Sequence, residues 1–257
     1  MMQQRVARLV IAAAVLTLAM VGAAQVPLLD HEEPSRWTPE SVSAALDAGA
    51  DVNARDEFGW TPLMRAAGLN ENPAVVRLLI DAGADLDARD EIGWTPLMHA
   101  VASNANPAVA QVLLDAGADL EAHDSFRRTP LVYAVTLNAN PAVAQLLLAA
   151  DVDLEAHDEF GWTPLMNAVA SNANPAVAQV LLDAGADLEA RDETGWTPLM
   201  HAARWSRNPD VLQVLLDAGA DGAARDERGR TAFDHARDNE ALRGSDAYWR
   251  LNDARFQ

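Results

Sequence analysis

The side chains that could carry out acid–base or metal chemistry are six histidines, at His31, His99, His123, His157, His201 and His235. His123 and His157 are separated by the same interval at which other motifs of the chain recur. They therefore occupy equivalent positions on adjacent structural units, and packed helices keep such units about 8–10 Å apart. That distance is too long for both imidazoles to ligate one zinc ion at about 2 Å. We predict that both lie on surface loops and bind no metal.

The remaining candidates for chemistry also fall into repeating positions rather than into a cluster. His99, His201 and His235 share one position of the repeat, so they could line a face but do not form a site. Acids such as Asp56 and Asp90 recur in the same way, and we expect them either to cap turns or to lie at solvent-exposed edges. No phosphate-binding loop, serine nucleophile motif or metal-ligand spacing is found. The sequence therefore predicts no catalytic residue, no metal site and no cofactor, in a protein that is not an enzyme.

The charge of the chain limits the class of partner. There are 38 Asp plus Glu residues against 19 basic residues, and the formal net charge is −19. Phosphate backbones and anionic membranes attract basic surfaces, so we expect no binding to nucleic acid or to a membrane surface. The chain has no cysteine, which excludes disulfides and cysteine-ligated zinc. Half of its residues are apolar, too many for a disordered chain.

The N-terminal segment at 1–24 has the composition of an export signal. Two arginines precede an apolar run at 9–21, and small residues follow at 22–24. This order of charge, apolar run and small-residue site is that of a signal peptide. A membrane anchor is the alternative, but a span needs about 20 apolar residues and this run is shorter. We predict a signal peptide at 1–24, a linker at 25–36, and a mature protein that is free of the membrane and lies in the periplasm or outside the cell.

Three short motifs recur at one constant interval, which indicates an internal repeat. Thr-Pro-Leu begins at Thr61, Thr95, Thr129, Thr163 and Thr197, with a degenerate copy at Thr231. Asn-Pro begins at Asn72, Asn106, Asn140, Asn174 and Asn208. Ala-Gly-Ala-Asp begins at Ala48, Ala82, Ala116, Ala184 and Ala218.

The local structure of one unit follows from its capping residues. Thr61 followed by Pro62 is an N-cap and a first-turn proline, so a helix begins there. Asn72 followed by Pro73 starts a second helix, which ends at Gly83. The stretch up to the next Thr-Pro-Leu is rich in turn residues and has no helical pattern. Each unit is therefore expected to be two short antiparallel helices followed by a projecting loop.

These motifs resemble those of the ankyrin repeat. The family pattern is matched at Asp56, Gly59, Thr61, Pro62, Leu63, Ala66, Ala67, Gly83, Ala84 and Asp85. The chain departs from it in its period, which is longer by one than the ankyrin period of about 33 residues. It also departs in Met64, which replaces the motif histidine and predicts weaker ties between loops. The resemblance covers residues 37–252, and it implies an all-α solenoid of ankyrin type, with stacked helix-loop-helix repeats, projecting β-turn loops and terminal caps, that binds another protein.

The repeat divides the rest of the chain into caps and full units within one elongated domain. Residues 37–55 hold only a second-helix equivalent, which predicts an N-terminal capping repeat. Five repeats occupy 56–225, at 56–89, 90–123, 124–157, 158–191 and 192–225. Residues 226–257 form a C-terminal capping repeat, with a polar helix pair predicted at 231–239 and 245–252. Such caps are needed because each unit buries its face only against a neighbour.

Large side chains recur on the loops, where ankyrin-like stacks usually bind partners. The position before Thr-Pro-Leu holds Trp60, Trp94, Arg128, Trp162, Trp196 and Arg230. Two positions earlier lie Phe58, Ile92, Phe126, Phe160 and Thr194, and Trp205 lies late in a first helix. If these sets face outward together, they form an aromatic ladder on the concave side, edged by glutamates, of the kind that protein interfaces use. The alternative is that neighbouring tryptophans pack together and join adjacent loops.

The third repeat lacks two glycines that the other repeats share. Arg127 replaces the glycine of the loop turn, and Asp151 replaces the glycine at the helix end. Each replacement costs about 1 kcal/mol if the backbone keeps its left-handed conformation. Arg127 and Arg128 then form a positive spot that could contact an acidic group of the partner, and drift in a tolerant repeat is the alternative.

The sequence thus predicts a protein–protein interaction module that is monomeric by itself. The alternative is a regulatory or inhibitory subunit of an exported enzyme. The candidate partner-binding residues are Trp60, Trp94, Trp162, Trp196, Phe58, Phe126, Phe160, Arg127, Arg128 and Trp205.

Overall fold

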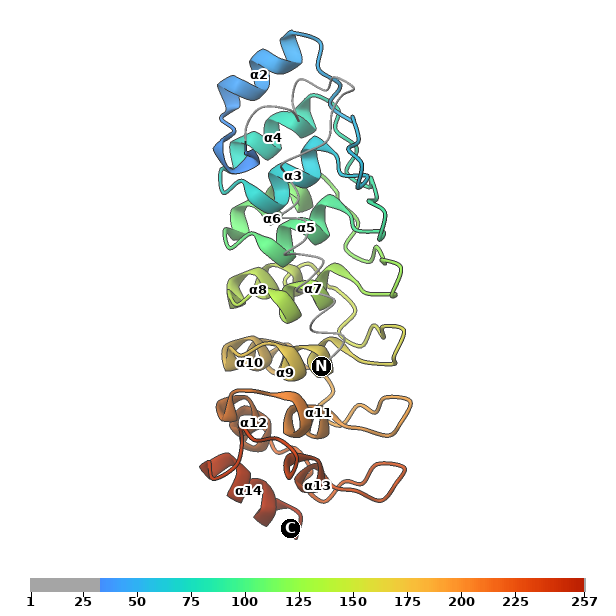
Figure 1. Ribbon diagram of the computed structural model, residues 1–257, viewed down its shortest axis with the longest axis vertical. Coiled ribbons are helices and arrows are strands. Elements are labelled where there is room, and N and C mark those ends of the chain that lie inside the picture. The colour runs from blue at the N-terminus through green and yellow to red at the C-terminus, as the bar shows by residue number, and fades with distance from the viewer. Residues whose placement is uncertain (1–32, 257) are drawn as a thin grey trace.

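The computed structural model describes residues 33–256, which form a column of helix pairs. In Figure 1 the pairs are stacked along the long axis, and the loops that connect successive pairs project from the same side. The predicted signal peptide at 1–24 and most of the predicted linker at 25–36 lie outside the described residues. The described part contains helices and no strand, so the expected all-α architecture is confirmed.

Each pair has a first helix next to the projecting loop and a second helix behind it. The first helices are α3 (Pro62–Leu69), α5 (Pro96–Ser103), α7 (Pro130–Leu137), α9 (Pro164–Ser171), α11 (Pro198–Trp205) and α13 (Ala232–Ala236). The second helices are α4 (Pro73–Asp81), α6 (Pro107–Asp115), α8 (Pro141–Leu148), α10 (Pro175–Asp183), α12 (Pro209–Asp217) and α14 (Asp246–Ala254). The N-terminal end is formed by a 3-10 turn, η1 (Pro34–Arg36), and by α2 (Pro39–Asp47). None of the described helices has the length and apolar character that a bilayer-spanning segment requires.

The helices begin and end where the capping residues predict. The Thr61 side chain accepts a hydrogen bond from the backbone N–H of Met64, with Pro62 in the first turn of α3. In α4, Asn72 accepts from the N–H of the second residue of the helix, and Gly83 follows the helix with a φ of +89°. Because these interactions are local in sequence, all five full repeats reproduce the two N-caps, and all but the third have this glycine after the second helix.

The core runs the length of the column. First helices pack on the first helices of neighbouring repeats, and second helices pack on second helices. Leu63 and Leu97 of the first helices, and Val75 and Leu79 of the second, are fully buried in this stack. One repeat alone could not cover such residues, so the stability of each repeat depends on its neighbours.

Buried asparagines tie consecutive repeats together. The Asn104 side-chain amide donates to the carbonyl of Ala67 (3.0 Å) and to that of Asn70 (2.8 Å), both in the preceding repeat. Asn138 and Asn172 make the same pair of bonds one and two repeats further on. The weaker ties expected from the missing motif histidine are thus offset by amide groups that satisfy buried carbonyls.

The C-terminal helix pair predicted at 231–239 and 245–252 is present as α13 and α14. The pair packs closely on Gly222, where an added Cβ would lie 2.5 Å from the Cβ of Ala254 and 2.8 Å from its carbonyl carbon. The equivalent position of the preceding repeats holds a leucine, at Leu86, Leu120, Leu154 and Leu188. Glycine at this one position therefore gives α14 room to cover the end of the column.

Candidate functional site

The projecting loops have a defined backbone because an aspartate organises each of them. Asp90 Oδ1 accepts hydrogen bonds from the N–H groups of Ile92 (3.0 Å) and Trp94 (2.8 Å), and Gly93 closes the turn with a φ of +88°. The same pair of bonds is made at Asp56, Asp124, Asp158, Asp192 and Asp226. The prediction that these acids cap turns is confirmed.

Adjacent loops are also joined to one another through the backbone. The N–H of Glu91 donates to the carbonyl of Phe58 (3.3 Å), and the N–H of Ser125 donates to that of Ile92 (3.1 Å). Loop tips that are bonded to their neighbours lose little conformational freedom when a partner binds. The loop edge is therefore a preorganised surface.

The second oxygen of the loop aspartate binds a side chain from the first helix that follows the loop. Asp90 Oδ2 lies 3.0 Å from His99 Nε2, and Asp192 Oδ2 lies 3.0 Å from His201 Nε2. His235 pairs with the last loop aspartate in the same way at 3.1 Å. All three histidines are buried, so the expectation that they line a face is wrong. In each pair the histidine follows the aspartate by 9 residues, and this constant separation is the pattern that could have revealed the pairs.

In the other repeats the partner of the loop aspartate varies in type, being Arg65, Tyr133 and Asn167. The position therefore accepts several side chains that can donate a hydrogen bond inside the stack. Because the aspartate–histidine pairs are covered from solvent, a substrate has no access to them. His123 and His157, by contrast, are exposed on loops as predicted. Across residues 33–256, no three carboxylate or imidazole groups converge as a metal site requires.

Tryptophans cover these buried pairs from both sides. The Trp94 ring centroid lies 5.1 Å from that of His99 in its own repeat and 4.3 Å from that of Tyr133 in the next. Trp60, from the preceding repeat, covers the other side of His99 at 4.4 Å. Each such side chain thus contacts two repeats and excludes water from the polar pair between them.

The same tryptophan contacts recur in the C-terminal half. Trp196 lies between His201 (5.2 Å) and His235 (4.0 Å), and Trp162 covers His201 at 4.2 Å. The predicted outward orientation is wrong for Trp94, which is 7% exposed, while the other three tryptophans are half-buried. The alternative, that these side chains join adjacent loops, accounts for the ring contacts of all four. A partner-binding role for the three half-buried tryptophans stays a prediction.

Arg128 takes the tryptophan position in the third repeat. Its Nε lies 3.6 Å from Oδ2 of Asp158, the fully buried loop aspartate of the next repeat, and its guanidinium lies 5.7 Å from the Phe126 ring centroid. A buried carboxylate needs such a partner, because an uncompensated buried charge is strongly destabilising. The predicted outward positive spot is therefore wrong for Arg128, whereas Arg127 is exposed with a φ of 60°.

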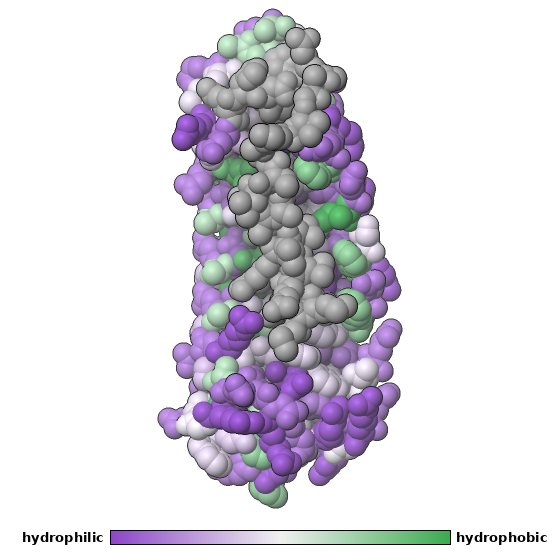
Figure 2. Space-filling view, viewed as in Figure 1, coloured by the Kyte–Doolittle hydropathy of each residue, from purple (hydrophilic) through white to green (hydrophobic). Residues whose placement is uncertain are grey.

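Four of the predicted aromatic residues do face solvent. Phe58 is 40% exposed, and Phe126, Phe160 and Trp205 are each 39% exposed, so their predicted outward orientation is confirmed. Figure 2 shows apolar residues as separate spots along the loop edge, with polar residues between them. Separate aromatic anchors in a polar surface are typical of protein interfaces.

Burial, nearby charge and hydrogen bonds shift the pKa of ionisable groups at the loops. Burial acts to raise the pKa of Asp192, but hydrogen bonds from His201, from Thr194 and from backbone N–H groups outweigh it and lower the pKa to about 2. Burial lowers the pKa of His235, and the nearby Arg230 charge lowers it further. The carboxylate is therefore ionised and His235 neutral near pH 7, as a structural hydrogen-bond network requires.

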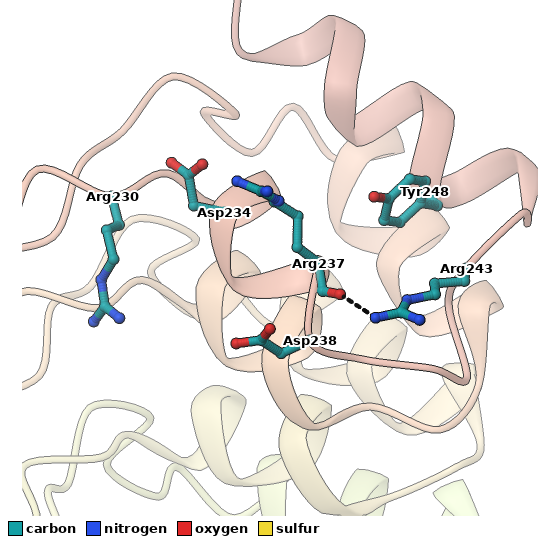
Figure 3. A pocket seen from close by; sticks show the side chains of 6 residues that line it. All are labelled: Arg230, Asp234, Arg237, Asp238, Arg243 and Tyr248. Carbon is teal, nitrogen blue, oxygen red and sulfur yellow. Dashed lines mark hydrogen bonds between the residues drawn. The ribbon is translucent and has the colours of Figure 1, made fainter.

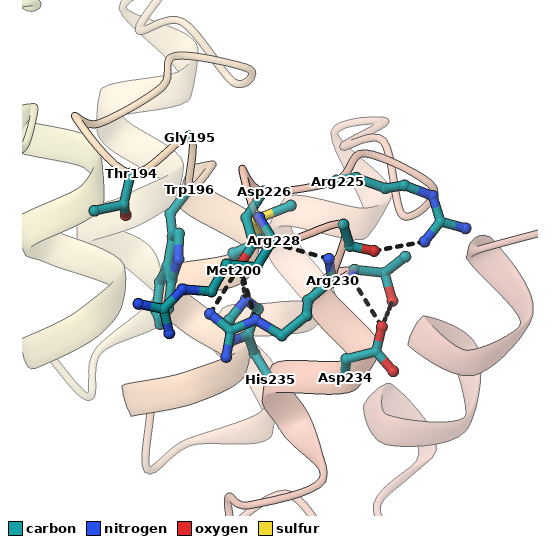
Figure 4. A network of polar contacts seen from close by, with 12 residues as sticks. Thr194, Gly195, Trp196, Met200, Arg225, Asp226, Arg228, Arg230, Asp234 and His235 are labelled. Carbon is teal, nitrogen blue, oxygen red and sulfur yellow. Dashed lines mark hydrogen bonds and ion pairs between the residues drawn. The ribbon is translucent and has the colours of Figure 1, made fainter.

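The last repeat shows this network most fully (Figure 4). Asp226 Oδ2 accepts a hydrogen bond from Arg230 Nε (3.0 Å) and forms an ion pair with Arg230 Nη2 (2.9 Å). It also lies 3.1 Å from His235 Nε2. Burial acts to raise the Asp226 pKa, but hydrogen bonds from Arg230, Arg228 and His235 lower it. Arg230 thus holds the tryptophan position here, as Arg128 does in the third repeat.

Stacked helix pairs with joined, projecting loops define a helical-repeat solenoid. The family model described as "Ankyrin repeats (3 copies)" matches the chain over residues 36–124, 102–192, 131–226 and 171–241. The chain belongs to the ankyrin repeat family. Ankyrin repeats are generally protein–protein interaction modules.

Solved ankyrin repeat structures are similar over most of the column. The human ASB11 ankyrin repeat domain aligns with a TM-score of 0.75 at 26% identity, covering 90% of this chain and 98% of that chain. The ankyrin repeat domain of Bcl-3, a unique member of the IkappaB protein family, aligns with a TM-score of 0.67 at 28% identity, covering 86% of this chain and 98% of that chain. No curated protein matches the chain in sequence.

Proposed function

We propose that this chain is an exported binding protein that captures another protein on the face formed by its loop tips and first helices. The observation that carries the proposal is the row of exposed phenylalanines at Phe58, Phe126 and Phe160, each held on a hydrogen-bonded loop. Exposed phenyl rings cost solubility unless a partner covers them. Aromatic side chains on rigid loops contribute most to binding affinity, because the loops lose little conformational entropy when a partner covers them.

The charge around the anchors limits the surface that fits them. The exposed glutamates Glu57, Glu91, Glu159 and Glu193 flank the loop tips. A partner with an apolar contact patch and a basic rim is complementary to this edge. Its association rate is expected to fall as salt is raised, because the rim charges are screened.

The export part of the proposal rests on the composition of residues 1–24. Cleavage after position 24 removes the apolar run and leaves the acidic repeat array. N-terminal sequencing of the protein recovered from the periplasm or the culture medium checks it. A recovered chain that still begins at Met1 rejects the cleavable signal.

The binding face is tested by replacing Phe58, Phe126 and Phe160 by alanine together. The purified protein is cross-linked in periplasmic extract, and the captured proteins are quantified by mass spectrometry. We expect the triple variant to lose about ten-fold in capture of its specific partner. Thermal unfolding should stay close to that of the wild type, because the three rings are exposed.

The matched control removes three exposed side chains from second helices, on the other side of the column. It replaces Gln111, Gln145 and Gln179 by alanine, and we expect capture to be unchanged. Equal capture by both triple variants rejects the loop face as the binding surface. If the captured partner is an enzyme, its activity is measured in a stoichiometric complex with this protein. Lost activity supports the inhibitory role, and retained activity supports the scaffold role.

A further inference from the structure

Charge is distributed unevenly along the column. Residues 33–203 contain eight arginines against 26 acids, whereas residues 204–256 contain nine arginines against ten acids. The C-terminal end is thus close to neutral, on a protein that is otherwise strongly acidic. Its surface is also predominantly hydrophilic, as Figure 2 shows at the lower end of the column.

An open hollow of about 640 Å³ lies at this end, formed by α13, α14 and the segments next to them. It is lined by Arg230, Asp234, Arg237, Asp238, Arg243 and Tyr248. Figure 3 shows these side chains arranged around the space. We call it the arginine hollow, because three of its six residues are arginines.

Both carboxylates of the arginine hollow already have partners. Asp234 Oδ2 accepts from the N–H of Thr231 (2.9 Å) and from its hydroxyl (3.0 Å), and the backbone bond in particular lowers the pKa of Asp234. Asp238 Oδ2 lies 3.3 Å from Arg204 Nη1, outside the hollow. Both acids are thus already engaged, and Asp234 also interacts electrostatically with Arg237, whereas neither forms an ion pair with Arg243.

Two of the arginines of the hollow form no close ion pair within the described part of the chain. Arg237 and Arg243 are exposed, and no carboxylate of the described chain lies within 4.0 Å of either guanidinium. Arg243 Nη2 donates to the Arg237 carbonyl (2.9 Å), which holds it at the rim (Figure 3). The Tyr248 ring is fixed against Phe233, with 5.1 Å between ring centroids, so its hydroxyl can serve as a further donor there.

These groups define the ligand chemistry. Forked guanidinium groups match the geometry of carboxylates and bind them through paired hydrogen bonds. Small-molecule sites are mostly apolar and enclosed, whereas this hollow is open and polar-walled. We infer that the arginine hollow binds the carboxylates of an acidic segment of the protein partner, an inference that rests on the proposed binding function.

The acidic body of the column gives this site its selectivity. Residues 33–203 repel an acidic segment, so the arginine hollow is the favourable place for it to bind. A partner whose basic rim meets the loop glutamates and whose acidic segment meets the hollow is held in one orientation. The two contacts involve different residues, so they can be tested separately.

The test uses a fluorescein-labelled octaglutamate peptide as the probe, with purified protein and fluorescence anisotropy at low salt. We expect saturable binding that weakens about ten-fold as salt is raised to about 0.3 M. The double variant Arg237→Gln/Arg243→Gln should weaken binding by at least about ten-fold, since both forked donors are removed. The control Arg36→Gln/Arg77→Gln makes the same change of net charge elsewhere, and should alter binding less than about two-fold.

Several outcomes overturn the inference. They are an absence of octaglutamate binding to the wild type, an equal loss in both double variants, and arginine-dependent binding of inorganic phosphate without binding of the peptide. Thermal unfolding of each variant excludes loss of fold as the cause. The two experiments also separate the two proposals. If the phenylalanine variant loses partner capture but the wild type does not bind octaglutamate, the arginine hollow is rejected and the proposed function still stands.

Discussion

Among single residues, the one before Thr-Pro-Leu determines how a repeat is joined to the next. In the second repeat it is Trp94, which is enclosed between His99 and Tyr133 and is 7% exposed. Removing a large buried ring leaves a cavity and exposes the polar groups that it covers. We expect Trp94→Ala to lower the free energy of unfolding by about 3–5 kcal/mol, measured by urea unfolding.

The control for this prediction is an aromatic residue of the same loop set that faces solvent. Phe126 is 39% exposed, and we expect Phe126→Ala to lower the free energy of unfolding by less than about 1 kcal/mol. Equal effects of the two substitutions would contradict the enclosed position of Trp94. Partner capture lost in Trp94→Ala without loss of stability would restore its predicted role as a binding residue.

The loop network makes stability depend on pH. The pKa of Asp192 is lowered to about 2 in the folded protein, so its stabilising effect is complete above the ordinary carboxyl pKa and is lost as the pH falls toward 2. The pKa of His235 is also lowered, so protonation of the unfolded chain favours unfolding as the pH falls below about 6.5. We expect the urea midpoint to be constant between about pH 7 and about pH 9 and to decrease in two steps on the acid side, below about pH 6.5 and below about pH 4.

His235→Gln separates the two steps, since glutamine can donate to Asp226 but does not titrate. The first decrease should be smaller in this variant, and the second should be unchanged. His123→Gln is the matched control, because His123 is exposed and both decreases should persist. A first step that is unaffected by His235→Gln would show that its proton uptake comes from other groups.

The sequence predicts the positions of these residues better than their orientation. The constant repeat interval places the tryptophans at equivalent points of successive repeats, whether they face outward or inward. Their orientation depends on the side chain that the next repeat offers, such as His99 for Trp60. That is a contact between repeats, which the pattern within one repeat does not contain.

Among helices, the fit of α14 against the last repeat depends on Gly222. An added Cβ would lie 2.8 Å from the carbonyl carbon of Ala254, in the backbone of α14, which cannot move away without displacing the helix. We expect Gly222→Ala to lower the free energy of unfolding by about 1–3 kcal/mol. Hydrogen exchange should be faster in α14 before it is faster in the central repeats.

A second glycine gives the matched control, with an expected change of opposite sign. Gly68 lies inside α3, and a Cβ there would have His99 Cβ at 3.6 Å, an ordinary contact distance. Ala102 already occupies the equivalent position of α5. We expect Gly68→Ala to raise the free energy of unfolding by about 1 kcal/mol, because alanine favours the helix. A loss of stability in both variants would show that close packing, and not the docking of α14, governs the result.

The helices themselves could be predicted from the sequence because their caps are local. Thr61 with Pro62, and Asn72 with Pro73, each start a helix within the same few residues. The replacement of leucine by Gly222 was visible in the same sequence. Its purpose was not predictable, because it depends on a helix that lies far along the chain.

For the whole molecule, stability is a sum over repeats and the contacts between neighbours. The third repeat lies in the middle of the column and carries two strained positions, Arg127 with a φ of 60° and Asp151 with a φ of 62°. The other four full repeats hold glycine at both of these positions. We therefore expect the column to separate most easily into two halves at this repeat.

Arg127→Gly/Asp151→Gly is therefore expected to raise the free energy of unfolding by about 1–2 kcal/mol, since glycine adopts the left-handed conformation with little strain. Because every repeat is stabilised by its neighbours, the gain should also sharpen the unfolding transition, and hydrogen exchange should slow in α7 and α8. His123→Gly, at an exposed loop position without a positive φ, should give no gain. An equal gain from His123→Gly would place the weak point of the column elsewhere. A more stable double variant that loses partner capture would instead show that Arg127 is kept for binding at the expense of stability.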